Sequence, residues 1–76
     1  MERGKVVRLE SFGLGFLQQE GSEEQFPFRF DQISGYRGES PRSIGLRIGA
    51  DVSFTLRNDR VETILLEGHR QPAYAK

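Results

Sequence analysis

The sequence predicts a small all-β domain in which five short antiparallel strands form a barrel. Apolar, β-branched and aromatic residues alternate with small or polar ones in five short segments, which is the period of a strand. Turns rich in glycine or polar residues separate these segments, and no segment carries a sustained helical period. Because 76 residues make one small domain, we expect all five strands to share a single core.

The turn signals divide the chain into strands and connections. A polar turn at residues 20–24 contains glycine, residues 34–47 read as a long loop with at most one short turn, and Asn58-Asp59 is a two-residue hairpin signal. We expect the domain to cover residues 1–67 and residues 68–76 to form a disordered tail. The five predicted strands cover residues 5–9, 12–19, 25–30, 50–57 and 60–66.

The second strand, residues 12–19, contains a glycine at an inward position. Alternation places Leu14 and Phe16 on one face and Gly15 and Leu17 on the other. A glycine inside a strand lets another backbone approach closely or lets the strand coil sharply. This strand is therefore suited to a small barrel, with Phe16 facing outward.

The third strand carries three phenylalanines of one parity. Phe26, Phe28 and Phe30 face one way, whereas Pro27 and Arg29 face the other. Proline has no N–H to donate to a neighbouring strand, so Pro27 predicts that this strand is at least partly an edge of the sheet. Phe30 fits either the core or a ligand-facing position.

The last strand leaves two neighbouring apolar residues, Ile64 and Leu66, on the outer face. Such residues can mark a surface for a protein partner, whereas a register that differs by one residue would bury them. The inward positions of the last two strands are Val52, Phe54, Leu56, Val61, Thr63 and Leu65. The predicted core comprises Val6, Gly15, Leu17, Phe26, Phe28, Ile33, Val52, Phe54 and Leu65.

The charge composition argues against tight, non-specific adhesion to nucleic acid. Eleven basic and eleven acidic residues give a formal net charge of zero. Nine of the eleven cations are arginine, whose planar guanidinium can stack and can contact phosphate through two hydrogen bonds. The longest apolar run, residues 64–66, is too short to cross a bilayer, and no signal peptide is visible at the N-terminus. We expect a cytoplasmic protein.

Catalytic and metal-binding residues are scarce in the sequence. There is no cysteine, and the single histidine, His69, falls in the predicted tail. No spacing of histidines and carboxylates resembles a metal site. We therefore expect no enzyme activity, no metal and no cofactor.

Three stretches, residues 4–17, 25–33 and 46–54, resemble the cold-shock domain family. Residues 4–6 (Gly-Lys-Val) and 12–17 (Phe-Gly-Leu-Gly-Phe-Leu) are similar to the family's opening strand and its Lys-Gly-Phe-Gly-Phe-Ile motif. Residues 25–30 (Gln-Phe-Pro-Phe-Arg-Phe) are similar to its Asp-Val-Phe-Val-His-Phe motif, and Ile33 falls where the family has isoleucine. Residues 46–54 match its Leu-x-x-Gly-x-x-Val-x-Phe pattern. The resemblance covers about residues 4–66 and implies an oligonucleotide-binding (OB-fold) barrel of the cold-shock type.

The chain departs from the family at several surface positions. Arg8 replaces a tryptophan, Phe12 replaces the lysine that opens the first motif, and Leu14 replaces that motif's first aromatic residue. In the second motif, Pro27 replaces the surface aromatic residue and Arg29 replaces the histidine. The aromatic side chains that the family has at the positions of Arg8, Leu14 and Pro27 are therefore missing here.

The resemblance implies binding of single-stranded RNA or DNA across this face. With fewer aromatic platforms, we expect binding to be weak, of low specificity and carried mainly by phosphate contacts. The alternative is a protein-interaction or structural module that kept the cold-shock barrel, with a partner at Ile64 and Leu66. The candidate nucleic-acid-binding residues are Lys5, Arg8, Leu14, Phe16, Arg29, Phe30, Tyr36 and Arg37.

Overall fold

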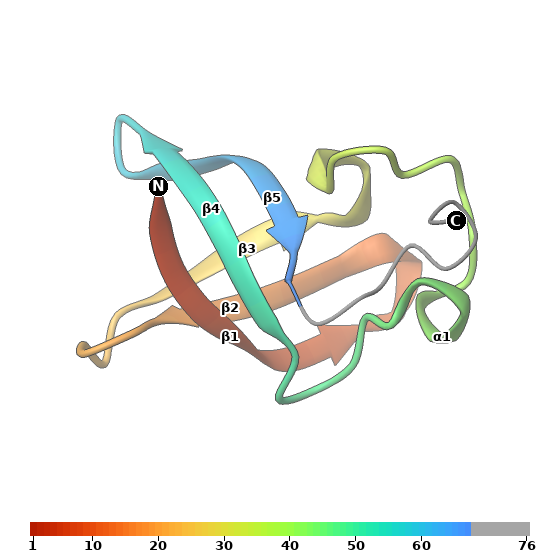
Figure 1. Cartoon of the computed structure of the whole chain (residues 1–76), viewed down its shortest axis with the longest axis horizontal. Coiled ribbons are helices and arrows are strands. Elements are labelled where there is room, and N and C mark those ends of the chain that lie inside the picture. Colours follow the sequence, from red (N-terminus) through yellow and green to blue (C-terminus); the bar gives the residue numbers. More distant parts are fainter. Residues whose placement is uncertain (68–76) are drawn as a thin grey trace.

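The computed structural model describes residues 1–67 and consists of five antiparallel strands, joined by short turns except for a long loop between the third and fourth strands (Figure 1). The 3₁₀ turns cover Ser11–Gly13 and Phe30–Gln32, and one short helix, α1, covers Pro41–Ile44. The strands are β1 (Glu2–Glu10), β2 (Leu14–Gln19), β3 (Gln25–Arg29), β4 (Asp51–Arg57) and β5 (Arg60–Leu66). The predicted all-β class is confirmed, and the predicted tail, residues 68–76, lies outside the described residues.

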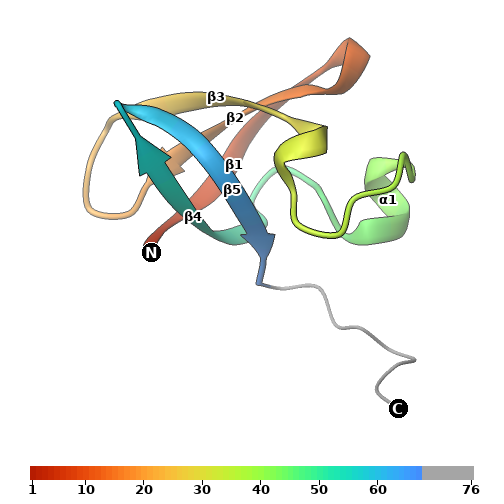
Figure 2. The same cartoon turned by 90° about the horizontal axis from the view of Figure 1, so that it is seen from above.

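The strands form one curled sheet in the order β3-β2-β1-β4-β5. The curl brings the two edge strands toward each other, so that β3 and β5 come into contact (Figure 2). A parallel bridge joins Ile33 to Ile64, and the Ser34 N–H donates a hydrogen bond of 2.7 Å to the Ile64 carbonyl. The arrangement is a half-barrel and is compatible with the predicted barrel.

A bulge in β1 reverses the direction of the side chains in the C-terminal half of the strand. Val6 pairs with Leu17, but the next pair along the two strands is Arg8 with Phe16, so Val7 is an extra residue. Because an extra residue reverses the alternation, Arg8 points outward although it shares the parity of buried Val6.

Most of the predicted core is confirmed. Val6, Leu17 and Phe54 are almost completely buried, and Phe28 packs over Gly15 at the centre of the curl. A Cβ on Gly15 would lie 2.7 Å from Cζ of Phe28, so only glycine leaves room for the ring. The buried hydrophobic residues are Val6, Leu17, Phe26, Phe28, Phe30, Ile33, Leu46, Ala50, Val52, Phe54, Val61 and Ile64.

The predicted orientation of β5 is confirmed at Val61, which is buried, and is wrong beyond it. Leu65 is 42% exposed, whereas Ile64 is fully buried and Leu66 is partly buried against the core. Thr55 pairs with Thr63, but Leu56 pairs with Val61, so Glu62 is an extra residue in β5. This bulge reverses the alternation beyond Val61, which a strict period of two cannot anticipate.

The connections agree well with their sequence signals. Asn58 and Asp59 both have left-handed backbones, with φ of 54° and 64°, as a two-residue hairpin requires. In the long loop, the Ser40 hydroxyl accepts from the Ser43 N–H at the start of α1, and Gly45 ends the helix with a left-handed φ of 79°. No helix among residues 1–67 is long and apolar enough to span a membrane.

We predict that Gly15→Ala lowers the free energy of unfolding by about 1–3 kcal/mol, because the added methyl group overlaps the Phe28 ring. Chemical denaturation would measure this loss. Phe28→Leu removes Cζ, so the double variant should be less destabilised than the sum of the two single variants.

Gly4→Ala is the matched control. Its added Cβ would clash with the backbone carbonyl of Gln18, which no side-chain truncation relieves. Phe28→Leu should therefore add its full cost to Gly4→Ala. If Phe28→Leu also adds its full cost to Gly15→Ala, the Phe28 ring is not what requires glycine at position 15.

Candidate nucleic-acid interface

The outer face of β1, β2 and β3 is organised as three cross-strand rows. Residues directly opposite one another in antiparallel strands hold their side chains side by side. The register places an arginine, a phenylalanine and a proline in the middle row, with more polar rows on either side. From β1 through β2 to β3, the rows are Lys5, Gln18 and Gln25; Arg8, Phe16 and Pro27; and Glu10, Leu14 and Arg29.

The middle row contains a cation–π contact. The guanidinium carbon of Arg8 lies 5.6 Å from the centre of the Phe16 ring. Arg8 also forms an ion pair with Glu10, which belongs to the neighbouring row. Phe16 is therefore partly covered, and the exposed guanidinium plane of Arg8 is the more accessible stacking surface.

The third row combines an apolar residue with a second arginine. Leu14 is partly buried beside Arg29, whose side chain is 70% exposed. Arg29 Nε lies 3.1 Å from Asp31 Oδ1, and the Arg29 backbone N–H donates to Gln32 Oε1 at 2.7 Å. The chain thus fixes the Arg29 backbone while its side chain extends into solvent with a carboxylate nearby.

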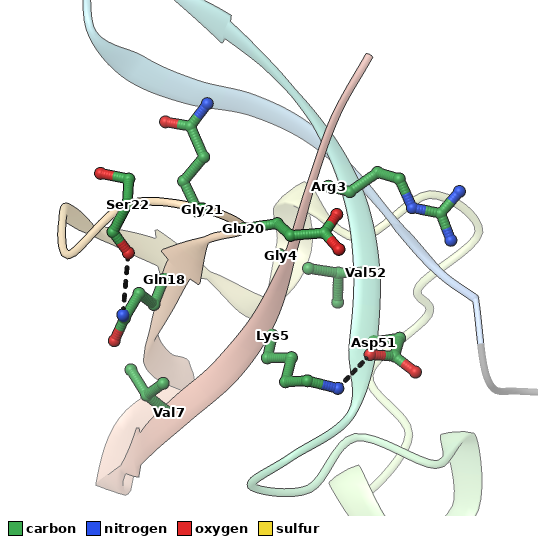
Figure 3. A pocket seen from close by; sticks show the side chains of 11 residues that line it. Arg3, Gly4, Lys5, Val7, Gln18, Glu20, Gly21, Ser22, Asp51 and Val52 are labelled. Carbon is green, nitrogen blue, oxygen red and sulfur yellow. Dashed lines mark hydrogen bonds and ion pairs between the residues drawn. The ribbon is translucent and has the colours of Figure 1, made fainter.

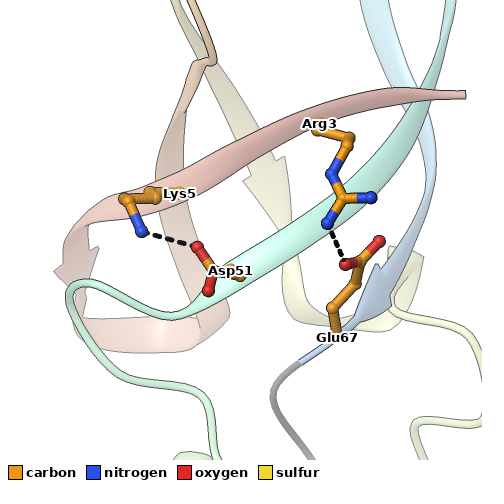
Figure 4. Close-up of polar contacts among 4 residues, drawn as sticks. All are labelled: Arg3, Lys5, Asp51 and Glu67. Atoms are coloured by element: carbon orange, nitrogen blue, oxygen red, sulfur yellow. Dashed lines mark hydrogen bonds and ion pairs between the residues drawn. The ribbon is translucent and has the colours of Figure 1, made fainter.

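The side chain of Lys5, in the first row, extends toward β4 (Figure 4). Its ammonium donates a hydrogen bond of 2.6 Å to Asp51, and the pKa of this carboxyl is below its ordinary value, chiefly because of that hydrogen bond. Beside it, Arg3 pairs with Glu67 at 2.7 Å. Both cations are exposed but already have carboxylate partners.

A polar hollow of about 440 Å³ adjoins the first row at Lys5 and Gln18 (Figure 3). The Gln18 side-chain amide donates to the Ser22 carbonyl at 2.9 Å. Acidic Glu20 and Asp51 line the hollow together with the basic residues Arg3 and Lys5. The balance of charge gives this hollow no clear preference for an anion, and no metal-binding cluster occurs within residues 1–67.

The prediction that Phe30 presents its ring to a ligand is not supported, because Phe30 is only 8% exposed. Its ring centre lies 6.3 Å from that of Phe28 and 6.1 Å from that of Tyr36, which meets it edge-on. Phe30 keeps the inward parity of Phe26 and Phe28, and this packing outweighs its position in the motif.

Tyr36 and Arg37 lie in the loop beyond Phe30. Tyr36 is partly buried, and its hydroxyl donates to the Glu39 carbonyl at 2.9 Å. The Arg37 backbone N–H donates to the Glu39 carboxylate and is the main cause of the lowered pKa of that group. Arg37 is exposed and forms no ion pair within the described part of the chain.

The structure thus brings Arg8, Leu14, Phe16 and Arg29 together, with Lys5 at the far row. It does not provide the predicted surface for a protein partner, since Ile64 is buried. The predicted strand over residues 12–19 begins at Phe12, whereas Phe12 lies in the turn before β2 and is the most exposed large hydrophobic residue described. The signal for this was Gly13, which follows Phe12 directly and favours a turn.

Comparisons with known proteins do not assign the chain to a family. No protein-family model matches the sequence, and no curated protein matches it significantly.

We predict that Lys5→Met raises the pKa of Asp51 toward the ordinary aspartate value of about 3.9, because the variant removes the main cause of the lowered pKa. Carbon-13 shifts of the carboxyl group followed against pH would measure this change. The ion pair stabilises the fold above the ordinary pKa, and this contribution is lost as pH falls through the lowered pKa.

Arg57→Met is the matched control, because Arg57 pairs with Glu62 on the β4–β5 hairpin. It should leave the pKa of Asp51 unchanged. If the pKa of Asp51 is the same in the wild type and in Lys5→Met, the hydrogen bond from the Lys5 ammonium to Asp51 is absent in solution.

Proposed function

We propose that the protein binds single-stranded RNA or DNA weakly, and with little sequence preference, across the outer face of β1, β2 and β3. The observation that carries the proposal is the stacked pair of Arg8 and Phe16 in the middle row, with Lys5 in one flanking row and Arg29 in the other. Stacking surfaces bordered by cations are what unpaired nucleotides require. The proposed architecture is an OB-fold barrel of the cold-shock type.

The bases of the bound strand would stack on the guanidinium of Arg8 as well as on the ring of Phe16. A guanidinium plane stacks on bases and also contacts phosphate, so Arg8 can serve both parts of a nucleotide. Its neighbours Leu14, Phe16 and Pro27 offer no side-chain hydrogen bonds to base edges. Low sequence preference follows from that composition.

The ion pairs account for weak binding. Lys5 pairs with Asp51, Arg8 with Glu10 and Arg29 with Asp31, so a phosphate must displace a carboxylate at each of these cations. The side chains of Lys5, Arg8 and Arg29 are all more than 60% exposed, which keeps such an exchange accessible. The phosphate contacts then make the affinity salt-dependent.

We predict that Phe16→Ala and Arg29→Ala each weaken binding of a short oligothymidylate by about tenfold, because each removes a stacking surface or a phosphate contact. Backbone amide shifts followed by NMR titration at low salt would give the affinities and show that the variants are folded. Arg57→Ala, on the β4–β5 hairpin, is the control and should change the affinity little. Folded variants that bind as the wild type does would exclude this face.

We also predict that combining Glu10→Gln with Asp31→Asn strengthens binding several-fold, because Arg8 and Arg29 then lose their competing carboxylates. Each phosphate contact contributes about 0.7 to the slope of log affinity against log salt for single strands. Phosphate contacts from all four of Lys5, Arg8, Arg29 and Arg37 would give a slope of about −3. The slope measured for the wild type should be less steep than this, because carboxylates compete for its cations. Affinities measured across a salt series would test both expectations.

Glu62→Gln is the control for this variant. It removes one negative charge beside Arg57, on another part of the molecule. If it strengthens binding as much per charge as the other two substitutions do, net charge rather than local competition sets the affinity.

A further inference from the structure

Phe12 is fully exposed and has a strained backbone. Its exposed fraction is 103%, so the protein covers none of its ring. Its φ is 66°, in the left-handed region that bulky residues disfavour, and the next residue, Gly13, is left-handed as well with a φ of 76°. A large apolar side chain stands at a position that glycine or asparagine would occupy with less strain.

The other phenylalanines all have packing partners. Phe26, Phe28, Phe30 and Phe54 are in the core, and Arg8 covers Phe16. Phe12 therefore adds nothing to the core, and both faces of its ring are open to solvent. Because strain that no internal contact offsets is typical of functional positions, a ligand is the natural partner for this ring.

The turn that holds Phe12 adjoins the third row of the outer face. It joins β1 to β2 directly beyond the row of Glu10, Leu14 and Arg29, and Figure 2 shows it at the end of the β1–β2 hairpin, away from α1. Phe16 lies four residues further along the chain, in the middle row. A nucleic-acid strand that follows β2 outward from Phe16 would cross Leu14 and then reach the turn that holds Phe12.

The surroundings favour a nucleobase over an apolar protein surface. Among residues 1–67, the other exposed large hydrophobic residues are Met1 at the chain start, Ile48 before β4 and Leu65 on β5, so none belongs to the same turn. An isolated ring is too small for a hydrophobic docking patch, whereas one ring is enough to stack one base.

We propose that Phe12 is a stacking platform for an unpaired base of the bound strand, extending the interface beyond β2 by one nucleotide. This inference rests on the proposed function, because the strand must already lie on the outer face. Phe12 then supplies the only ring among residues 1–67 whose two faces are both free.

The experiment uses the whole chain, an oligothymidylate and three variants. Phe12→Trp introduces the only tryptophan of the protein, so its fluorescence should be quenched on titration while the affinity is kept. Phe12→Leu keeps an apolar side chain without a ring and should bind about tenfold more weakly. Phe12→Asn should bind as weakly as Phe12→Leu, but should melt at a higher temperature because asparagine tolerates the left-handed backbone.

An abasic oligonucleotide of the same length separates stacking from backbone contacts. The wild type and Phe12→Leu should bind it equally, because no base is present to stack. If Phe12→Leu binds oligothymidylate as tightly as the wild type while Phe16→Ala binds it more weakly, Phe12 is not a stacking platform. The proposed function would still stand in that case. No binding by the wild type even at low salt would overturn both.

Discussion

The close packing of β1 and β2 at Gly4 and Gly15 is the constraint on which the rest of the structure depends. A Cβ at Gly15 would overlap the Phe28 ring, and one at Gly4 would overlap the backbone of β2. With hydrogen there instead, the hairpin coils tightly enough for the sheet to wrap around Phe28 and Phe54. The curl in turn lets Ile33 reach Ile64, so that the edge strands meet without a sixth strand.

The same coiling determines the chemistry of the outer face. In β2, the inward positions are taken by Gly15 and Leu17, which leaves Leu14 and Phe16 outside. The bulge at Val7 then turns Arg8 outward, directly opposite Phe16. Without that one extra residue, Arg8 would point into the core, where an unpaired guanidinium is strongly disfavoured. The cation–π pair at the centre of the proposed interface is therefore a consequence of strand geometry.

Period-two alternation predicted the strands because each strand has one buried face. It predicted both ends of β5 to the residue, and the turn at Asn58 and Asp59 followed from their tolerance of left-handed backbones. It failed for Leu65, because the bulge at Glu62 depends on pairing with β4, and local sequence does not encode that register. For the site, alternation placed Phe16 and Arg29 outside, but the ion pairs of Arg8 and Arg29 depend on side-chain conformations that no pattern specifies.

Those ion pairs limit how strongly the proposed interface can attract a nucleic acid. A neutral chain has no long-range field to concentrate a polyanion, so attraction must come from local cations. Three of these cations, Lys5, Arg8 and Arg29, already share their charge with carboxylates in solvent-exposed pairs, which contribute little to the stability of the fold. Exchanging a carboxylate for a phosphate then changes the partner of each cation without disturbing the core beneath it. We propose that a face built in this way would bind and release a strand easily, since neither state leaves a buried charge unpaired.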